Sequence, residues 1–229
     1  MAPLPITLAA RLLPTAVLAI VGWSMSTSGG SGADAQGQTS GSPNPSVSSS
    51  ASGSASTSNA SYAKPPAACT SITAATLKKL VPGVKTAGKE LKLTDPTHRT
   101  GCSWNALKGF DYRWLDVTFE IASAAEGTAT PQSAAQVAHQ TYVSQKQSTA
   151  LSGIGNEASF STSLTKDDGQ QTQEAVLVVR QGNALVTVTY NGSDFETKKA
   201  PSIDEVSKGA QSAAKEALAA LGKASTVAS

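Results

Sequence analysis

Apolar and polar residues alternate most regularly over 113–121, where Leu115, Val117, Phe119 and Ile121 occupy every second position. The residues between them are mostly polar, so one face of this segment belongs to a core and the other faces water. A sheet that is polar on one face is typical of antiparallel rather than doubly covered parallel architecture. The segment therefore predicts a strand of an antiparallel sheet.

Shorter runs of β-branched and apolar residues predict four further strands, at 100–107, 159–164, 174–180 and 184–190. The last two form a hairpin about a Gly-Asn turn. The lysine-rich segment 84–93 is ambiguous, and one interpretation is an edge strand whose lysines deter pairing with another chain. About five strands are thus expected in the sheet.

Three helices follow from capping residues and stripes with helical spacing. The first is predicted over 71–81, from a serine cap to a Pro-Gly stop. The second is predicted over about 130–147, starting at a Thr-Pro pair. In the third, Ser202 and Glu205 are expected to form a capping box, and Gly222 to end a stripe made mostly of alanine. Small side chains allow this helix to approach the sheet closely.

The resulting element order, α-β-β-α-β-β-β-α, predicts the α+β class. We expect an antiparallel sheet of about five strands with three helices packed on one side of it or at one end. This single domain is expected to occupy residues 65–223.

Residues 1–23 have the form of an export signal. Arg11 precedes an apolar run over 12–23 that is short for a membrane span but suits the hydrophobic part of a secretory signal. A candidate cleavage site, Ala33-Asp34-Ala35, lies about ten residues beyond the run. A cleaved signal peptide and a retained signal anchor both stay open at this point.

Residues 24–64 consist almost entirely of Ser, Gly, Ala and Thr, with very few charges. Such a segment cannot bury enough apolar area to offset its conformational entropy, so a disordered, low-complexity linker is predicted. A flexible coil of about forty residues spans on the order of 35 Å. Its hydroxyl groups would suit O-glycosylation, which the sequence does not decide.

The chain contains two cysteines, Cys69 and Cys102, and both follow the export signal and the linker. An even number of cysteines in an exported chain predicts one disulfide bond in an oxidising compartment. The bond would join the first helix to the first core strand. The alternative is a pair of free, buried thiols.

Charge and residue clusters exclude several classes of function. The net charge is +2, and the bases that gather over 64–99 are more typical of a solvated face than of a surface for wall polymer or lipid headgroups. The two histidines, His98 and His139, are far apart, and no G-x-S-x-G motif or nucleotide-binding glycine pattern occurs. A Ser–His–Asp arrangement at His98 stays open but is disfavoured. No enzyme activity, metal, cofactor or nucleic-acid partner is therefore expected.

Three aromatic residues, Trp104, Tyr112 and Trp114, are close together along the sequence. One interpretation places them in a group on one surface, where they would offer a platform for ligand stacking. Core or edge packing is the favoured alternative.

A set of short motifs covers about two thirds of the chain. It consists of Cys69, the Leu-x-x-Leu-Val-Pro-Gly motif at 77–83, Gly101-Cys102-Ser103-Trp104, the segment 153–158, the strand pair at 177–180 and 186–188, and the closing alanine-rich helix. This set resembles an actinobacterial, Streptomyces-like envelope lipoprotein family of unknown function with a Cys…Cys-Ser-Trp core, and in outline it is also similar to extracellular sensor domains of membrane kinases. The resemblance implies that the chain is a member of this family, but it implies no activity, because the family has none assigned. The segment around 18–24 also resembles a lipoprotein signal, but Trp23 stands where the lipid-bearing cysteine would be.

Two functions remain. The first is a non-catalytic extracytoplasmic domain tethered at the cell envelope, membrane-anchored or secreted, that binds or senses an unknown ligand or partner. The second is a structural or interaction protein of the envelope without a small-molecule ligand. A large apolar pocket with converging polar groups would favour the first, and a solid core with a flat surface would favour the second. Contact with the membrane would come through the N-terminal segment if it is uncleaved.

Overall fold

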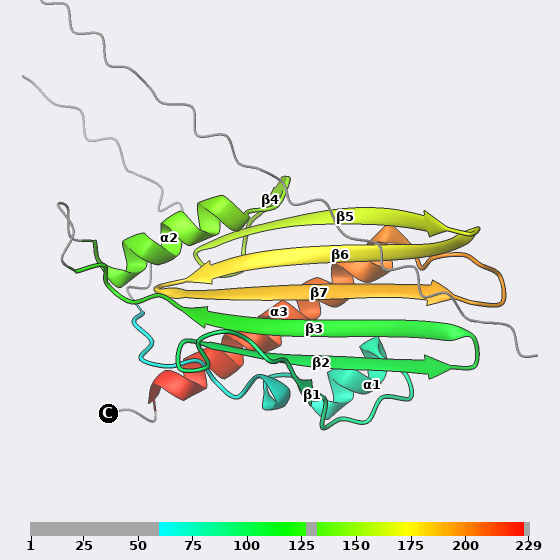
Figure 1. Cartoon of the computed structure of the whole chain (residues 1–229), viewed down its shortest axis with the longest axis horizontal. Helices are drawn as coiled ribbons and strands as arrows, with labels where there is room; N and C mark the ends of the chain where they lie inside the picture. Colours follow the sequence, from blue (N-terminus) through cyan, green and yellow to red (C-terminus); the bar gives the residue numbers. More distant parts are fainter. Residues whose placement is uncertain (1–59, 127–131, 227–229) are drawn as a thin grey trace, which may run out of the picture. The chain divides into compact units, whose positions relative to one another are not determined.

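The computed structural model describes residues 60–126 and 132–226. Within these residues the strands form one seven-stranded antiparallel sheet in the order β1-β2-β3-β7-β6-β5-β4 (Figure 1). The strands are β1 (Lys89–Glu90), β2 (Arg99–Lys108), β3 (Asp111–Ile121), β4 (Thr149–Leu151), β5 (Glu157–Asp167), β6 (Gln170–Gln181) and β7 (Ala184–Asp194). The α+β class and the antiparallel sheet are confirmed, with two strands more than the five expected.

The helices cover the two faces of the sheet unequally. They are η1 (Ala68–Thr70), α1 (Ala74–Leu80), α2 (Ala134–Gln145) and α3 (Ile203–Thr226). Helix α3 runs diagonally behind the sheet in Figure 1 and, with α1 and η1, encloses the main core against β2, β3, β6 and β7. Helix α2 packs on the opposite face, where Ala138 and Tyr142 contact Val178 and Leu185. We call the α3 side the core face and the other side the outer face.

The alternation predicted for β3 is present. Leu115, Val117, Phe119 and Ile121 are buried on the core face, and the residues between them are intermediate or exposed. The register is fixed on both sides, because Phe119 pairs with Thr100 of β2 and with the β7 residue Val186. The outer face of β3 is therefore open to solvent where α2 does not cover the sheet.

The small-residue stripe of α3 brings this helix close to the sheet. Its buried residues are Val206, Ala210, Ala213, Ala214, Ala217 and Leu221. At Gly209 a Cβ atom would lie 2.5 Å from the Tyr190 ring, so glycine permits the approach. The Tyr190 hydroxyl donates to the backbone oxygen of Leu80 at 2.6 Å, and burial raises the pKa of Tyr190 to about 12. Tyr190 thereby links α1, α3 and β7.

The ends of α3 differ from the prediction. Ser202 accepts the backbone N–H of Glu205 at 3.1 Å, as a cap should. The Glu205 carboxylate, however, accepts hydrogen bonds from Arg113 on β3, so the second half of the expected capping box is replaced by a tertiary ion pair. The helix also continues past Gly222 to Thr226.

The other two helices begin later than predicted. The cap of α1 is Thr73, which accepts the Thr76 N–H, whereas the Ser71 hydroxyl donates to Ala68 within the preceding turn. Helix α2 is capped by Ser133 in a reciprocal capping box with Gln136. The Thr-Pro pair at 130–131 lies outside the described residues.

The described part of the chain starts with a buried clasp. The Tyr62 N–H donates to Asn183 Oδ1 at 2.7 Å, and Asn183 Nδ2 donates to the backbone oxygens of Tyr62 and Ala122 at 3.0 Å each. Packing thus begins before residue 65. The expected export signal, its cleavage site and all but the end of the expected linker lie outside the described residues. No helix within 60–126 or 132–226 is long and apolar enough to cross a membrane.

Candidate functional site

Strand β2 lies near one edge of the sheet, and only its first half is covered. Strand β1 pairs Lys89 with Ser103 and Glu90 with Cys102, and no pairing on this side reaches further along β2. The chain before β1 leaves the plane of the sheet instead of continuing the ladder. The segment predicted as an edge strand over 84–93 therefore contributes two paired residues and a loop.

The pairing pattern shows which backbone groups of β2 are left open. The Leu91 N–H donates to the Gly101 oxygen at 3.0 Å, so odd-numbered residues of β2 direct their backbone groups toward β1 and even-numbered residues toward β3. Beyond Ser103 the odd-numbered residues are Asn105 and Leu107. Their N–H and C=O groups face the uncovered edge, and no other described residue bonds to them. Such groups bind water or a partner strand.

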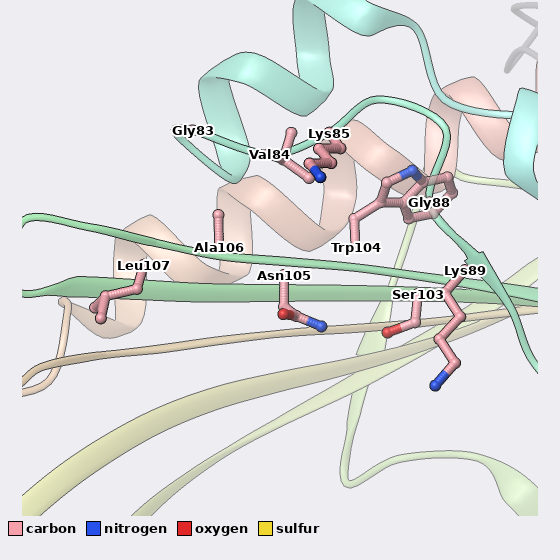
Figure 2. Close-up of a pocket in the computed structure, with 10 residues that line it drawn as sticks. All are labelled: Gly83, Val84, Lys85, Gly88, Lys89, Ser103, Trp104, Asn105, Ala106 and Leu107. Atoms are coloured by element: carbon pink, nitrogen blue, oxygen red, sulfur yellow. The ribbon is translucent and has the colours of Figure 1, made fainter.

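A hollow of about 370 Å³ lies along this open edge. Figure 2 shows Lys89, Ser103, Asn105 and Leu107 pointing to one side of the strand, and Trp104 and Ala106 to the other. The full lining is Gly83, Val84, Lys85, Gly88, Lys89, Ser103, Trp104, Asn105, Ala106 and Leu107. The open backbone and the hollow together define the candidate site, which we call the β2 edge site.

The loop that forms one wall of the hollow depends on Gly88. This residue has a φ of +67°, and a Cβ atom here would lie 2.5 Å from both Cys102 Sγ and Trp104 Nε1. The buried Trp104 indole donates to the Thr86 oxygen at 3.2 Å and holds the loop above the strand. Only glycine combines this backbone conformation with this close approach.

Replacing Gly88 by Ala is expected to lower the free energy of unfolding by about 2–5 kcal/mol, because a left-handed backbone and an overpacked contact are combined. The matched control is Gly109→Ala, since Gly109 also has positive φ, +65°, but nothing within 4 Å of its Cβ position. The control should cost about 1–2 kcal/mol in the same urea titration. Equal costs at the two positions would contradict the close approach at Gly88.

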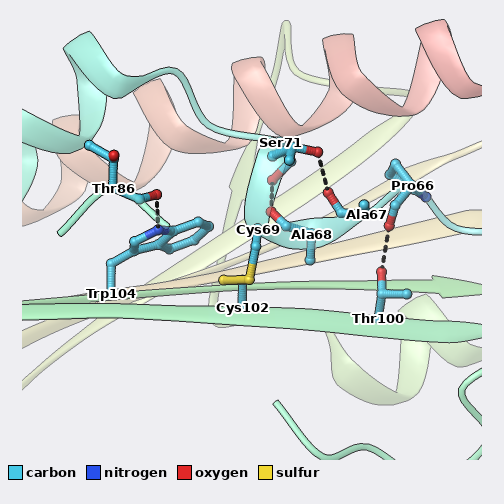
Figure 3. The surroundings of a disulfide bond; sticks show 10 residues. Pro66, Ala67, Ala68, Cys69, Ser71, Thr86, Thr100, Cys102 and Trp104 are labelled. Carbon is cyan, nitrogen blue, oxygen red and sulfur yellow. Dashed lines mark hydrogen bonds between the residues drawn. A yellow bond between two sulfur atoms is a disulfide. The ribbon is translucent and has the colours of Figure 1, made fainter. Parts of the chain in front are cut away.

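The predicted disulfide supports the inner end of the site (Figure 3). Cys69 in η1 and Cys102 in β2 are bonded, with their Cα atoms 5.0 Å apart. A hydrogen bond from Thr100 Oγ1 to the Pro66 oxygen, at 2.8 Å, holds the same turn on the same strand. Trp104 lies on the Cys102 side of β2. The alternative of two free thiols is excluded by the bond.

The three aromatic residues Trp104, Tyr112 and Trp114 are divided between the two faces of the sheet, and Trp104 packs in the core, as the favoured interpretation has it. Trp104 pairs with Leu115 and lies on the core face, so Trp114, the next residue on β3, lies on the outer face. Tyr112 and Trp114 contact each other edge to face at 6.4 Å between ring centroids, and Phe195 lies 6.0 Å from Tyr112. The Trp114 N–H donates to Asp116 at 2.6 Å. A smaller aromatic surface thus exists, without Trp104.

His98 takes part in an arrangement that resembles a nucleophilic triad. Its Nδ1 lies 3.1 Å from Asp95 Oδ2, and its Nε2 lies 3.2 Å from Ser123 Oγ. A hydrogen bond from Thr97 and then one from His98 lower the pKa of Asp95 below its ordinary value. The Asp95 side chain is 55% exposed, whereas the aspartate of such a triad is normally buried. None of the hollows described here is lined by these residues.

His139 forms a second polar cluster, beside α2. Its Nδ1 lies 3.0 Å from Glu157 Oε2, and Arg180 Nε donates to the same oxygen. Burial acts to raise the pKa of Glu157, but the hydrogen bonds from His139 and Arg180 outweigh it and lower the pKa. A hollow of about 430 Å³ lies beside this cluster. The Glu157 carboxylate thus compensates the charge of Arg180 within the cluster.

No group of three or more His, Cys, Asp or Glu residues in the described part of the chain is arranged to hold a metal ion. Comparison of the chain with protein-family models, curated proteins and solved structures found no match in any of the three. The interpretation of the site therefore rests on its geometry.

Proposed function

We propose that this protein is a non-catalytic domain, held outside the membrane at the cell envelope by its N-terminal segment, that binds a partner along the β2 edge site. The observation that carries the proposal is the open backbone of Asn105 and Leu107 beside a hollow. Unpaired strand edges are places where another chain adds to a sheet, and folds usually cover or block them. Here the adjacent loop turns away and leaves the edge accessible.

The location outside the membrane is supported by two features of the chain. Arg11 and the apolar run after it have the form of an export signal. The Cys69–Cys102 bond is of the kind that persists in oxidising compartments. A structural role in the envelope without a small-molecule ligand is the alternative, and it has the same location.

The shape of the site favours a macromolecular partner over an enclosed small molecule. Small-molecule sites commonly bury 70–90% of the ligand, roughly, in a concave pocket. The hollow at β2 is an open trough along a strand, and the main core next to it is filled by packed side chains. An extended partner that lies along the strand fits this geometry.

A photo-crosslinking amino acid introduced at Asn105 of the full chain, in intact cells that export it, is expected to yield a covalent adduct. Asn105 lines the hollow at the uncovered edge of β2, whereas the control position, Leu164 on β5, is exposed at the opposite edge, beyond the last β4 pairing, and does not line this hollow. Adducts should be resolved by gel shift and mass spectrometry. Absence of an adduct at position 105, or equal yields at 105 and 164, would contradict the proposal.

The His98 arrangement favours a hydrolase as a second candidate function, and serine labelling separates the two candidates. We expect no reaction of Ser123 with a fluorophosphonate probe, because the Asp95 side chain of this arrangement is 55% exposed, whereas the aspartate of a catalytic triad is normally buried. The control is the Ser123→Ala variant under the same conditions. Labelling of the unmodified chain that disappears in this variant would overturn the non-catalytic assignment.

A further inference from the structure

We infer that the partner at the β2 edge site is an acidic polypeptide segment that adds to the sheet as an extra strand. The inference rests on the proposed function and specifies the chemistry of the partner. It combines three observations at one place: a backbone that lacks a partner, two lysines without ion pairs, and an exposed apolar side chain.

The backbone requirement selects a polypeptide. Asn105 and Leu107 each present an N–H and a C=O to the open edge, and their spacing along the strand is about 6.6–6.8 Å. A polypeptide in extended conformation repeats its own N–H and C=O groups at this interval. Sugar polymers and lipid headgroups have no such repeat. Strand addition of this kind obtains affinity from main-chain hydrogen bonds and specificity from alternate side chains.

The charge around the hollow selects an acidic segment. Lys85 and Lys89 both line the hollow, and neither forms an ion pair within the described residues. Lys108 lies at the far end of β2, where it is exposed. A partner that carries carboxylates would thus meet Lys85 in the loop, Lys89 near one end of the open stretch and Lys108 near the other. Such complementary charge speeds association and fixes the register of the bound strand.

The same lysines disfavour a second copy of this chain. Two-fold antiparallel pairing of two β2 edges would place Lys89 of one copy, which lies beside Ser103, toward Lys108 of the other. Like charges on strand edges are a common means of preventing such association. Electrostatic repulsion therefore disfavours the pairing of two lysine-bearing edges, whereas attraction favours the pairing of one such edge with an acidic strand. The charge of the edge thus favours an acidic segment as its partner over a second copy of this chain.

An apolar residue is expected at one position of the added strand. Leu107 is 57% exposed and pairs with Tyr112, which contacts Trp114 on the outer face. The partner residue directly opposite Leu107 would place its side chain on this same face. An acidic strand with apolar residues at alternate positions would therefore place its apolar side chains on the face of Leu107 and the aromatic surface, and its carboxylates on the opposite face, where Lys85 lies.

The test uses the exported, disulfide-bonded chain and a synthetic seven-residue peptide of alternating Glu and Val. A peptide of alternating Lys and Val is the control. We expect the Glu peptide to bind at least about tenfold more tightly than the Lys peptide, with a difference that shrinks as salt is added. Fluorescence polarisation measures both affinities. Equal affinities, or a preference for the Lys peptide, would overturn the inference.

Amide hydrogen exchange locates the peptide. The amide protons of Asn105 and Leu107 should gain at least about tenfold protection when the Glu peptide binds, and that of Ala106 should not change, because it already faces β3. Protection that does not distinguish the odd-numbered residues would exclude strand addition. If a crosslinked adduct forms at Asn105 in cells but the Glu peptide leaves the amide exchange rates unchanged, the inference of strand addition is wrong. The proposed function, binding of a partner at the β2 edge site, would still stand.

Two variants separate the contributions of backbone and charge. Leu107→Pro removes one outward N–H without removing a bond to β3, and it should weaken Glu-peptide binding at least about tenfold. The double variant Lys85→Glu with Lys89→Glu should reverse the preference toward the Lys peptide, whereas Lys166→Glu on β5 should not. Circular dichroism confirms that each variant is folded. Retention of Glu-peptide preference in the folded double variant would contradict the role of the lysines.

Discussion

Replacing Phe119 by Ala is expected to lower the free energy of unfolding by about 3–5 kcal/mol, the usual range for truncation of a buried aromatic residue. Phe119 is 1% exposed on the core face of β3, the third strand of the sheet, between Thr100 and Val186 on the neighbouring strands. The cavity left by its ring would be enclosed by strands and helices that cannot collapse freely. Urea denaturation of the oxidised chain measures the change.

The control for this prediction is the adjacent residue. Thr118 lies on the outer face and is only partly buried, so Thr118→Ala should cost less than about 1 kcal/mol. A larger loss at Thr118 than at Phe119 would mean that β3 is shifted by one residue. Every side chain of the strand would then exchange faces, including Trp114 and the aromatic surface.

Reduction of the disulfide is expected to destabilise the domain by about 2–4 kcal/mol and to lower its melting temperature by several degrees. The bond joins residues separated by 33 positions, so the reduced unfolded chain gains considerable freedom. The fold should survive, because β3, β5, β6, β7 and α3 all follow Cys102 and form most of the core. Thermal melts with and without reductant measure the effect.

A variant with both Cys69 and Cys102 replaced by Ala provides the control for the reductant itself. Its melting temperature should be lower than that of the oxidised chain and should not respond to reductant. Equal melting temperatures of the oxidised and reduced chains would show that the bond does not stabilise the fold. A thiol titration that finds both cysteines free in exported protein would contradict the bond directly.

The parts of the fold that depend on local pattern could be predicted from the sequence. The strict alternation from Leu115 to Ile121 identified the strand and its buried face, because a β-strand has a side-chain period of two. The hydroxyl of Ser202 identified the start of α3, because a cap satisfies an N–H three residues away. The cysteine pair predicted the disulfide because no other thiol was available.

The parts that depend on pairing between distant segments could not be predicted in this way. Strand β5 extends to Asp167, beyond the predicted end at 164, but residues 165–167 are Thr, Lys and Asp without an apolar position, so nothing in their sequence distinguishes them from a loop. Strand β4 is three residues long and exists only through its pairing with β5. One interpretation placed Trp104 and Trp114 on one surface, and only the β2–β3 register shows that they lie on opposite faces.

The candidate site was missed for the same reason. The lysines of 84–93 indicated an edge, but not that β1 would stop at Glu90 and leave Asn105 and Leu107 uncovered. Likewise, the contact of His98 with Ser123 joins residues that are 25 positions apart. A Ser–His–Asp arrangement was left open for His98, but nothing in the sequence indicated which serine would approach it.

The position of the disulfide has a mechanical consequence. If the chain is attached ahead of residue 60 and a partner is bound at Asn105, as proposed, force on the domain would be applied at these two points. Tension arriving through Tyr62 would load the Asn183 clasp first, and after its release would reach Cys69 and cross the covalent bond to Cys102. From there only two residues of β2, Ser103 and Trp104, separate the bond from Asn105. Once the clasp has opened, the load would therefore bypass β5, β6, β7 and α3, and these elements could stay folded under a force applied between Tyr62 and Asn105.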